Sequence, residues 1–73
     1  MKVKIRLDTV SDIKGFVDAV SGISEAVNLT DGNNFTVSAK SILGAMYTME
    51  WNEIYCTCDR NIYRFIQNYI LEE

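Results

Sequence analysis

Few residues of this chain could carry out chemistry, and histidine is not among them. None of the 73 residues is a histidine, which excludes every mechanism that needs an imidazole as base, nucleophile or metal ligand. The cysteines Cys56 and Cys58 stand two positions apart, so a strand would place both on one face, in line with Ile54. A lone Cys-x-Cys cannot complete a four-ligand zinc site. We therefore expect both thiols to pack in the core, with no metal or cofactor bound; a metal or redox role is the alternative.

The carboxylates are numerous, but their pattern does not predict an active site. Ten acidic residues against seven basic ones give a net charge of -3, which disfavours nucleic acid as a partner. No two carboxylates are spaced to face each other across a pocket, and a short chain has little wall to enclose one. We therefore expect no catalytic residues, and an enzyme is the weakest of the functional hypotheses.

Length and composition predict a single small domain over residues 1–73. Single-core domains run from about 50 to 200 residues, and a composition of 48% hydrophobic and 23% charged residues is typical of a globular chain. No apolar run approaches the roughly 20 residues of a membrane span, and the N-terminus lacks the apolar stretch of a signal peptide. We expect a cytoplasmic protein that does not bind membranes, and nothing in the residues decides between a monomer and a weak homodimer.

The first part of the chain predicts a strand followed by a helix. Strict alternation over residues 2–8 indicates a half-buried strand, and this alternation also explains the basic residues on its outer face. The inward residues are Val3, Ile5 and Leu7, and the outward ones are Lys2, Lys4, Arg6 and Asp8. Ser11 is the expected cap of a helix that Gly22 ends. Its apolar face comprises Ile13, Phe16, Val17 and Val20, and Gly15 within it costs roughly 1 kcal/mol relative to alanine, so tertiary packing must hold that turn.

The remainder predicts a hairpin, a short helix, a strand and a last helix. Residues 25–30 and 34–39 are β-prone on either side of the turn residues 31–33. Val27 and Leu29 should share the inner face with Phe35, Val37 and Ala39. A short apolar segment over 41–49 is capped by Ser41, and its apolar residues are too crowded to form a one-sided stripe, so we expect some of that surface to face water. A strand over 52–58 then leads to Asp59 as the cap of a helix with Ile62, Phe65, Ile66, Tyr69 and Ile70 on its apolar face. The order is βαββαβα, an α+β domain.

The stretch Val27–Met46, VNLTDGNNFTVSAKSILGAM, resembles the central region of the histidine-containing phosphocarrier (HPr) family of the sugar phosphotransferase system. The specific part is Lys40-Ser41-Ile42-Leu43-Gly44-Ala45-Met46, which follows a hairpin and opens a short helix, as in that family. The resemblance implies an open-faced two-layer sandwich, with a four-stranded antiparallel sheet in the order 1-4-2-3 and three helices on one face.

The resemblance does not extend to the family's active centre. Members carry a phospho-accepting histidine, with an arginine and a proline, between the first strand and the first helix, whereas this chain has Asp8-Thr9-Val10-Ser11-Asp12-Ile13-Lys14. The histidine position falls between Thr9 and Asp12. We therefore expect phosphohistidine transfer to be lost, and an acyl phosphate on Asp12 is a remote alternative.

Two features of the family can remain in this chain. The resemblance implies a regulatory phosphorylation site at Ser41, since a kinase modifies a serine at that place in some bacteria; the simpler interpretation is a helix cap alone. It also implies that Ile42, Leu43 and Met46 form an exposed docking patch for a protein partner, unless Leu43 or Met46 is needed to close the core.

These features predict a non-catalytic HPr-like module that regulates or binds another protein. The alternative is a small-molecule sensor of the ferredoxin-like or ACT type, since the order βαββαβ is shared. The two hypotheses differ in the sheet: the order 1-4-2-3 favours the phosphocarrier relative, and 4-1-3-2 the sensor.

Overall fold

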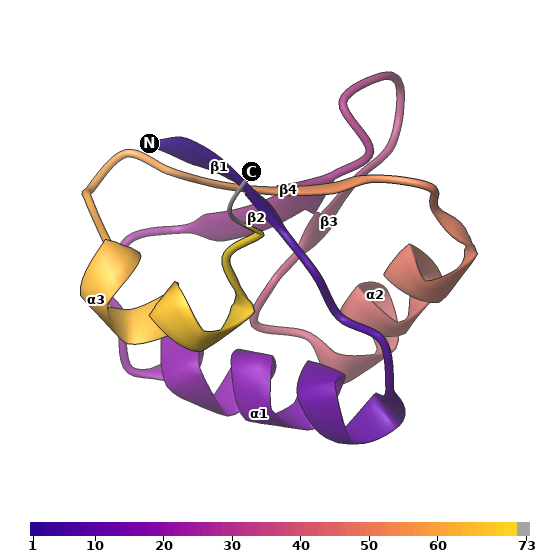
Figure 1. Cartoon of the computed structure of the whole chain (residues 1–73). Helices are drawn as coiled ribbons and strands as arrows, with labels where there is room; N and C mark the ends of the chain where they lie inside the picture. The colour runs from indigo at the N-terminus through magenta and orange to yellow at the C-terminus, as the bar shows by residue number, and fades with distance from the viewer. Residues whose placement is uncertain (72–73) are drawn as a thin grey trace.

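The computed structural model describes residues 1–71, which form a four-stranded antiparallel sheet covered on one face by three helices (Figure 1). The strand order is β1-β4-β2-β3. The elements are β1 (Lys2–Ile5), α1 (Val10–Ser21), β2 (Val27–Thr30), β3 (Thr36–Ser38), α2 (Ile42–Met46), the 3-10 turn η1 (Tyr47–Glu50), β4 (Ile54–Cys58), α3 (Tyr63–Ile66) and the 3-10 turn η2 (Gln67–Tyr69). The predicted α+β class, element order and sheet order are confirmed.

The core lies between the sheet and the helix layer. Cys56 on the central strand β4 pairs with Val3 of β1 on one side and Leu29 of β2 on the other. Period-two alternation sends Ile54, Cys56 and Cys58 to the helix face, where all three are buried as predicted. Opposite them lie the buried residues of α1, namely Ile13, Phe16, Val17 and Val20.

The N-cap of α1 is Thr9, two residues before the predicted cap at Ser11. The prediction of a cap at Ser11 was therefore wrong. The Thr9 hydroxyl accepts a hydrogen bond from the Asp12 amide at 3.0 Å. The Asp12 carboxylate accepts in return from the Thr9 amide at 3.2 Å. This reciprocal capping box satisfies two backbone donors at once, which a cap at Ser11 could not do with Lys14 three residues later. The end of the helix at Gly22 is confirmed.

The prediction that Phe35 lies inside was also wrong, because its side chain is 64% exposed. Leu29 pairs with Val37 across the hairpin, and Leu29 is buried as expected. Phe35, however, precedes β3 and belongs to the loop, which extends away from the helix layer in Figure 1. Alternation directs a side chain to a face of the sheet but does not ensure that anything covers it there.

The last helix is shorter than predicted, and Asp59 does not cap it. α3 starts at Tyr63, whose amide donates to the Asn61 side chain at 3.0 Å. Ile62 and Ile66 are buried as expected, whereas Phe65 is exposed. α3 ends at Ile66 and the 3-10 turn η2 follows it. The side chains beyond Ile66 therefore do not continue the α-helical spacing that the sequence predicts for the buried face.

The segment after η2 returns to the outer edge of the sheet. The Arg6 amide donates to the Tyr69 carbonyl at 2.8 Å, and the Leu71 amide donates to the Lys4 carbonyl at 2.9 Å. β1 is therefore covered along its free edge, which protects it from pairing with another chain. Within residues 1–71 no helix has the length and apolar character needed to cross a bilayer.

Candidate functional site

α2 opens at Ser41, as the sequence predicts. The Ser41 hydroxyl accepts a hydrogen bond from the Gly44 amide at 3.1 Å, which makes Ser41 the N-cap. The preceding turn is closed by the Ser41 amide, which donates to the Ser38 carbonyl at 3.3 Å. The Lys40 ammonium donates to the Ile23 carbonyl, so the only basic residue of the run Lys40–Met46 is engaged with the loop after α1. Ser41 itself is exposed to solvent.

The three residues predicted as a docking patch all lie on the surface of α2. Leu43 is 77% exposed, Ile42 43% and Met46 39%. Neither Leu43 nor Met46 closes the core; that role falls to Ala45, which is completely buried. We call Ile42, Leu43 and Met46 the α2 patch. Three large apolar side chains are thus exposed together on this short helix.

α2 is anchored by its small residues. A β-carbon on Gly44 would lie only 3.3 Å from the Ser38 carbonyl oxygen, so glycine allows the helix to approach the end of β3 closely. Thr48 is buried, and its hydroxyl donates to the Ala45 carbonyl at 2.6 Å. These contacts anchor α2 against the rest of the domain, and its exposed side chains project from the anchored backbone.

The sequence did not reveal an aromatic hollow next to α2. Phe35, Val37, Tyr47, Glu50 and Trp51 line a recess of about 460 Å³ between the start of β3 and η1. We call it the aromatic hollow. The signal that could have found it is the concentration of large aromatic residues in the two connections that flank the sheet, but their mutual position depends on the fold.

The N-terminus of α1, where the resemblance would place the phosphoryl group, is occupied by the protein's own carboxylate. Asp12 Oδ2 accepts from the amides of Asp8 at 3.0 Å and Thr9 at 3.2 Å. Arg6, which precedes this site, places its Nε 2.8 Å from an oxygen of the Asp8 carboxylate. The Asp8 and Thr9 amides, just before the helix, are therefore engaged with the Asp12 carboxylate, and the Asp12 amide is engaged with the Thr9 hydroxyl.

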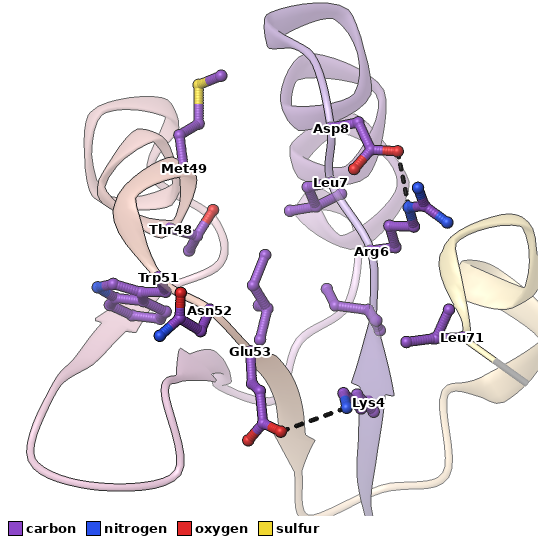
Figure 2. Close-up of a pocket in the computed structure, with 12 residues that line it drawn as sticks. Lys4, Arg6, Leu7, Asp8, Thr48, Met49, Trp51, Asn52, Glu53 and Leu71 are labelled. Atoms are coloured by element: carbon purple, nitrogen blue, oxygen red, sulfur yellow. Dashed lines mark hydrogen bonds and ion pairs between the residues drawn. The ribbon is translucent and has the colours of Figure 1, made fainter. Parts of the chain in front are cut away.

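A cleft of about 320 Å³ lies between the end of β1 and the connection from η1 to β4 (Figure 2). Figure 2 shows Thr48 and Met49 on one side of it and Leu7 on the other. Its charged groups pair within the protein. Lys4 Nζ lies 3.4 Å from Glu53 Oε1, and Arg6 binds Asp8 as described above.

The cysteines are free thiols in the core, as predicted. Burial raises the pKa of the Cys56 thiol to about 12, and the charge on neighbouring Cys58 adds to the rise. A thiol with so high a pKa carries almost no thiolate at neutral pH and is a poor nucleophile and metal ligand.

Comparisons of the chain with protein-family models, curated proteins and solved structures found no match. The function proposed below is therefore argued from the chain's own residues and fold.

Proposed function

We propose that this protein is a non-catalytic relative of the HPr phosphocarriers that binds a partner protein through the α2 patch. The observation that carries the proposal is the opening of a short helix at Ser41 within a sheet of order β1-β4-β2-β3. The run Lys40–Met46 thus follows β3 and leads into the short helix α2, which agrees with the resemblance and supports the proposal.

Loss of phosphoryl transfer rests on two independent features. The chain has no histidine to accept the group. In addition, the Asp12 carboxylate binds the amides of Asp8 and Thr9 at the start of α1, while the Asp8 carboxylate pairs with Arg6. An approaching phosphoryl donor would meet the negative charge of Asp12 at this site, which opposes the usual attraction of a helix N-terminus for anions.

The α2 patch has the properties of a protein-binding surface. Its side chains are aliphatic or thioether, which adapt to a partner without needing polar groups to be satisfied. Because Ala45 and Thr48 anchor the backbone beneath, little backbone conformational entropy is lost when the patch is covered. A partner would therefore gain most of the free energy of burying these side chains.

Ser41 provides a means of regulating that surface. Its hydroxyl is exposed and adjoins Ile42, so a phosphoryl group there would place about two negative charges at the margin of the patch. The charge would oppose an acidic or apolar partner and favour a basic one. Modification of Ser41 would thus change which partner binds.

The ACT-type alternative predicts the order 4-1-3-2, and the sheet has β1-β4-β2-β3. No feature of the described residues favours it over the phosphocarrier relative.

Charge substitution in the α2 patch tests the binding proposal. An interaction screen with the wild-type protein supplies the partner, and titration of the purified pair should show affinity lowered at least tenfold by Ile42→Glu or Met46→Glu. Val10→Glu is the matched control, because Val10 is equally exposed but lies at the start of α1. Binding that survives both patch variants would show that the patch is wrongly placed.

The loss of transfer is tested with the general phosphotransferase enzyme and labelled phosphoenolpyruvate, using an authentic histidine phosphocarrier as the positive control. We expect no acid-labile label on this protein. Labelling that depends on Asp12 would instead establish an acyl phosphate and overturn the non-catalytic proposal.

A further inference from the structure

The aromatic hollow combines three rings with a carboxylate. Phe35 is 64% exposed and Tyr47 63%, and Trp51 is half-buried and packs against the core. The Glu50 side chain lies on the same wall. A second groove of about 490 Å³ shares Phe35, Glu50 and Trp51 with the hollow and adds Asp31 and Glu53.

The charge of this surface is uniformly negative. Of the residues that the structure assigns to the two recesses, none is basic. Glu53 is paired with Lys4 at 3.4 Å, but within residues 1–71 no cation lies in ion-pair range of Glu50 or Asp31. The two cation–π contacts of the described chain, Lys2 with Tyr55 and Arg60 with Phe65, are elsewhere.

Trp51 packs against the core, but no ring pair of the described residues involves Phe35, Tyr47 or Trp51. The ring pair found in the described residues is Phe16 with Tyr69, in the core. The faces of Phe35, Tyr47 and Trp51 are therefore not stacked on one another. A ring face carries partial negative charge, so three rings beside a carboxylate form an environment that favours a cation, and each good cation–π contact contributes about 0.5–2 kcal/mol.

We propose that the aromatic hollow binds an arginine side chain carried by an extended segment of a partner protein. A guanidinium fits better than an ammonium, because it is planar, stacks on aromatic rings and donates two parallel hydrogen bonds to a carboxylate such as Glu50. The inference deepens the proposed function by naming the partner's chemistry, but it depends on residues outside the α2 patch.

The edge strand β3, next to the hollow, is the reason we expect the partner segment to be extended. The Phe35 carbonyl accepts from the Asp31 amide and the Ala39 amide donates to the Val27 carbonyl, so these residues of the β3 segment bond toward β2. In an antiparallel ladder Thr36 and Ser38 then direct their N–H and C=O outward. The Ser38 carbonyl already accepts from the Ser41 amide, so Thr36 is the part of this edge that a partner strand would pair with. No strand of the described chain lies beyond β3. An added strand would place alternate side chains on the helix face, beside the hollow.

A second copy of the chain is a poorer occupant. Symmetric pairing of two β3 edges would bring Glu50 and Asp31 of one copy toward the same carboxylates of the other. With a net charge of -3 on each chain, like charges at the contact oppose this association.

Trp51 is the chain's only tryptophan and reports on the hollow directly. We would titrate the protein with the peptide acetyl-Thr-Val-Arg-Val-Thr-amide and with the same peptide carrying citrulline, the uncharged analogue of arginine, while following tryptophan fluorescence. The arginine peptide should bind at least fivefold more tightly, and the difference should shrink as salt is raised.

Two variants separate the hollow from general charge effects. Glu50→Gln should reduce the preference for arginine over citrulline, whereas Asp18→Asn, the same change of charge on the exposed face of α1, should preserve it. Phe35→Ser should weaken binding of both peptides. Equal binding of the two peptides, or no response of Trp51 fluorescence, would overturn the inference. Ile42→Glu should leave the peptide titration unchanged, so failure of the α2 patch and failure of the hollow give different results.

Discussion

The phenolic hydroxyl of Tyr69 lies in the space that a β-carbon on Gly15 would occupy. The next ring atom of Tyr69 is 3.7 Å from that point, and the ring packs edge-on against Phe16 with centroids 5.3 Å apart. The glycine inside α1 therefore has a steric reason. It admits a side chain from the end of the chain, which in turn continues into the segment that covers β1.

We expect Gly15→Ala to lower the free energy of unfolding by about 1–3 kcal/mol, although alanine is the better helix former by roughly 1 kcal/mol. Tyr69→Phe in the same chain should recover much of the loss, because it removes the oxygen that clashes. Urea unfolding of the two single variants and the double variant measures the coupling. Gly22→Ala is the control, since a β-carbon there meets nothing within 4 Å. Equal effects of Gly15→Ala and Gly22→Ala would contradict the packing described.

Removing the α1 cap should be costly. Thr9→Ala breaks the bond to the Asp12 amide and should destabilise the protein by about 1 kcal/mol, whereas Ser11→Ala should change stability little. Thermal unfolding of the two variants distinguishes the observed cap from the one that the sequence alone suggested. A larger loss in Ser11→Ala would place the cap at Ser11 after all.

The α2 patch should be replaceable without loss of stability. Leu43→Glu should alter the free energy of unfolding by no more than about 0.5 kcal/mol, because Leu43 lies largely in solvent. Leu29→Ala, which truncates a fully buried leucine, should cost about 2–5 kcal/mol. Denaturant titrations give both values. Severe destabilisation by Leu43→Glu would mean that the residue closes the core.

Ser41 should be needed to keep α2 closed. Ser41→Ala removes the cap and should speed hydrogen exchange at the Ala45 amide, which bonds the Ser41 carbonyl at 2.8 Å. Ser41→Asp should preserve the cap, since aspartate is an equally good N-cap residue. Exchange that is unchanged in Ser41→Ala would show that the cap contributes nothing to α2.

Burial of the Cys56 thiol should make the free energy of unfolding decrease as pH rises above about 9. The Cys56 pKa is raised to about 12 in the folded state from an ordinary value of 9.0, so the unfolded chain releases this proton first as pH increases. Between these pH values, Cys56 alone should lower stability by about 1.4 kcal/mol per pH unit. Cys56→Ala should show a shallower dependence above pH 9 in urea unfolding. Identical slopes for the two proteins would contradict the raised pKa.

The sequence by itself determined the features that depend on local periodicity and on the presence of a residue type. Alternation placed Ile54, Cys56 and Cys58 in the core, and helical spacing identified the buried face of α1. These predictions succeeded because side-chain direction follows from backbone geometry within a few residues. The absence of histidine likewise needed no structure to exclude imidazole chemistry.

Only the tertiary structure decided what covers each face and which distant residues meet. Phe35 continues the period-two pattern of the hairpin in the sequence, but it lies in the loop before β3 and is exposed to solvent. The aromatic hollow joins Phe35 to Tyr47 and Trp51 across the hairpin and η1, and Tyr69 reaches Gly15 from the other end of the chain. Such contacts depend on how separate elements pack, and packing is set by the whole set of side chains rather than by the pattern within any one segment.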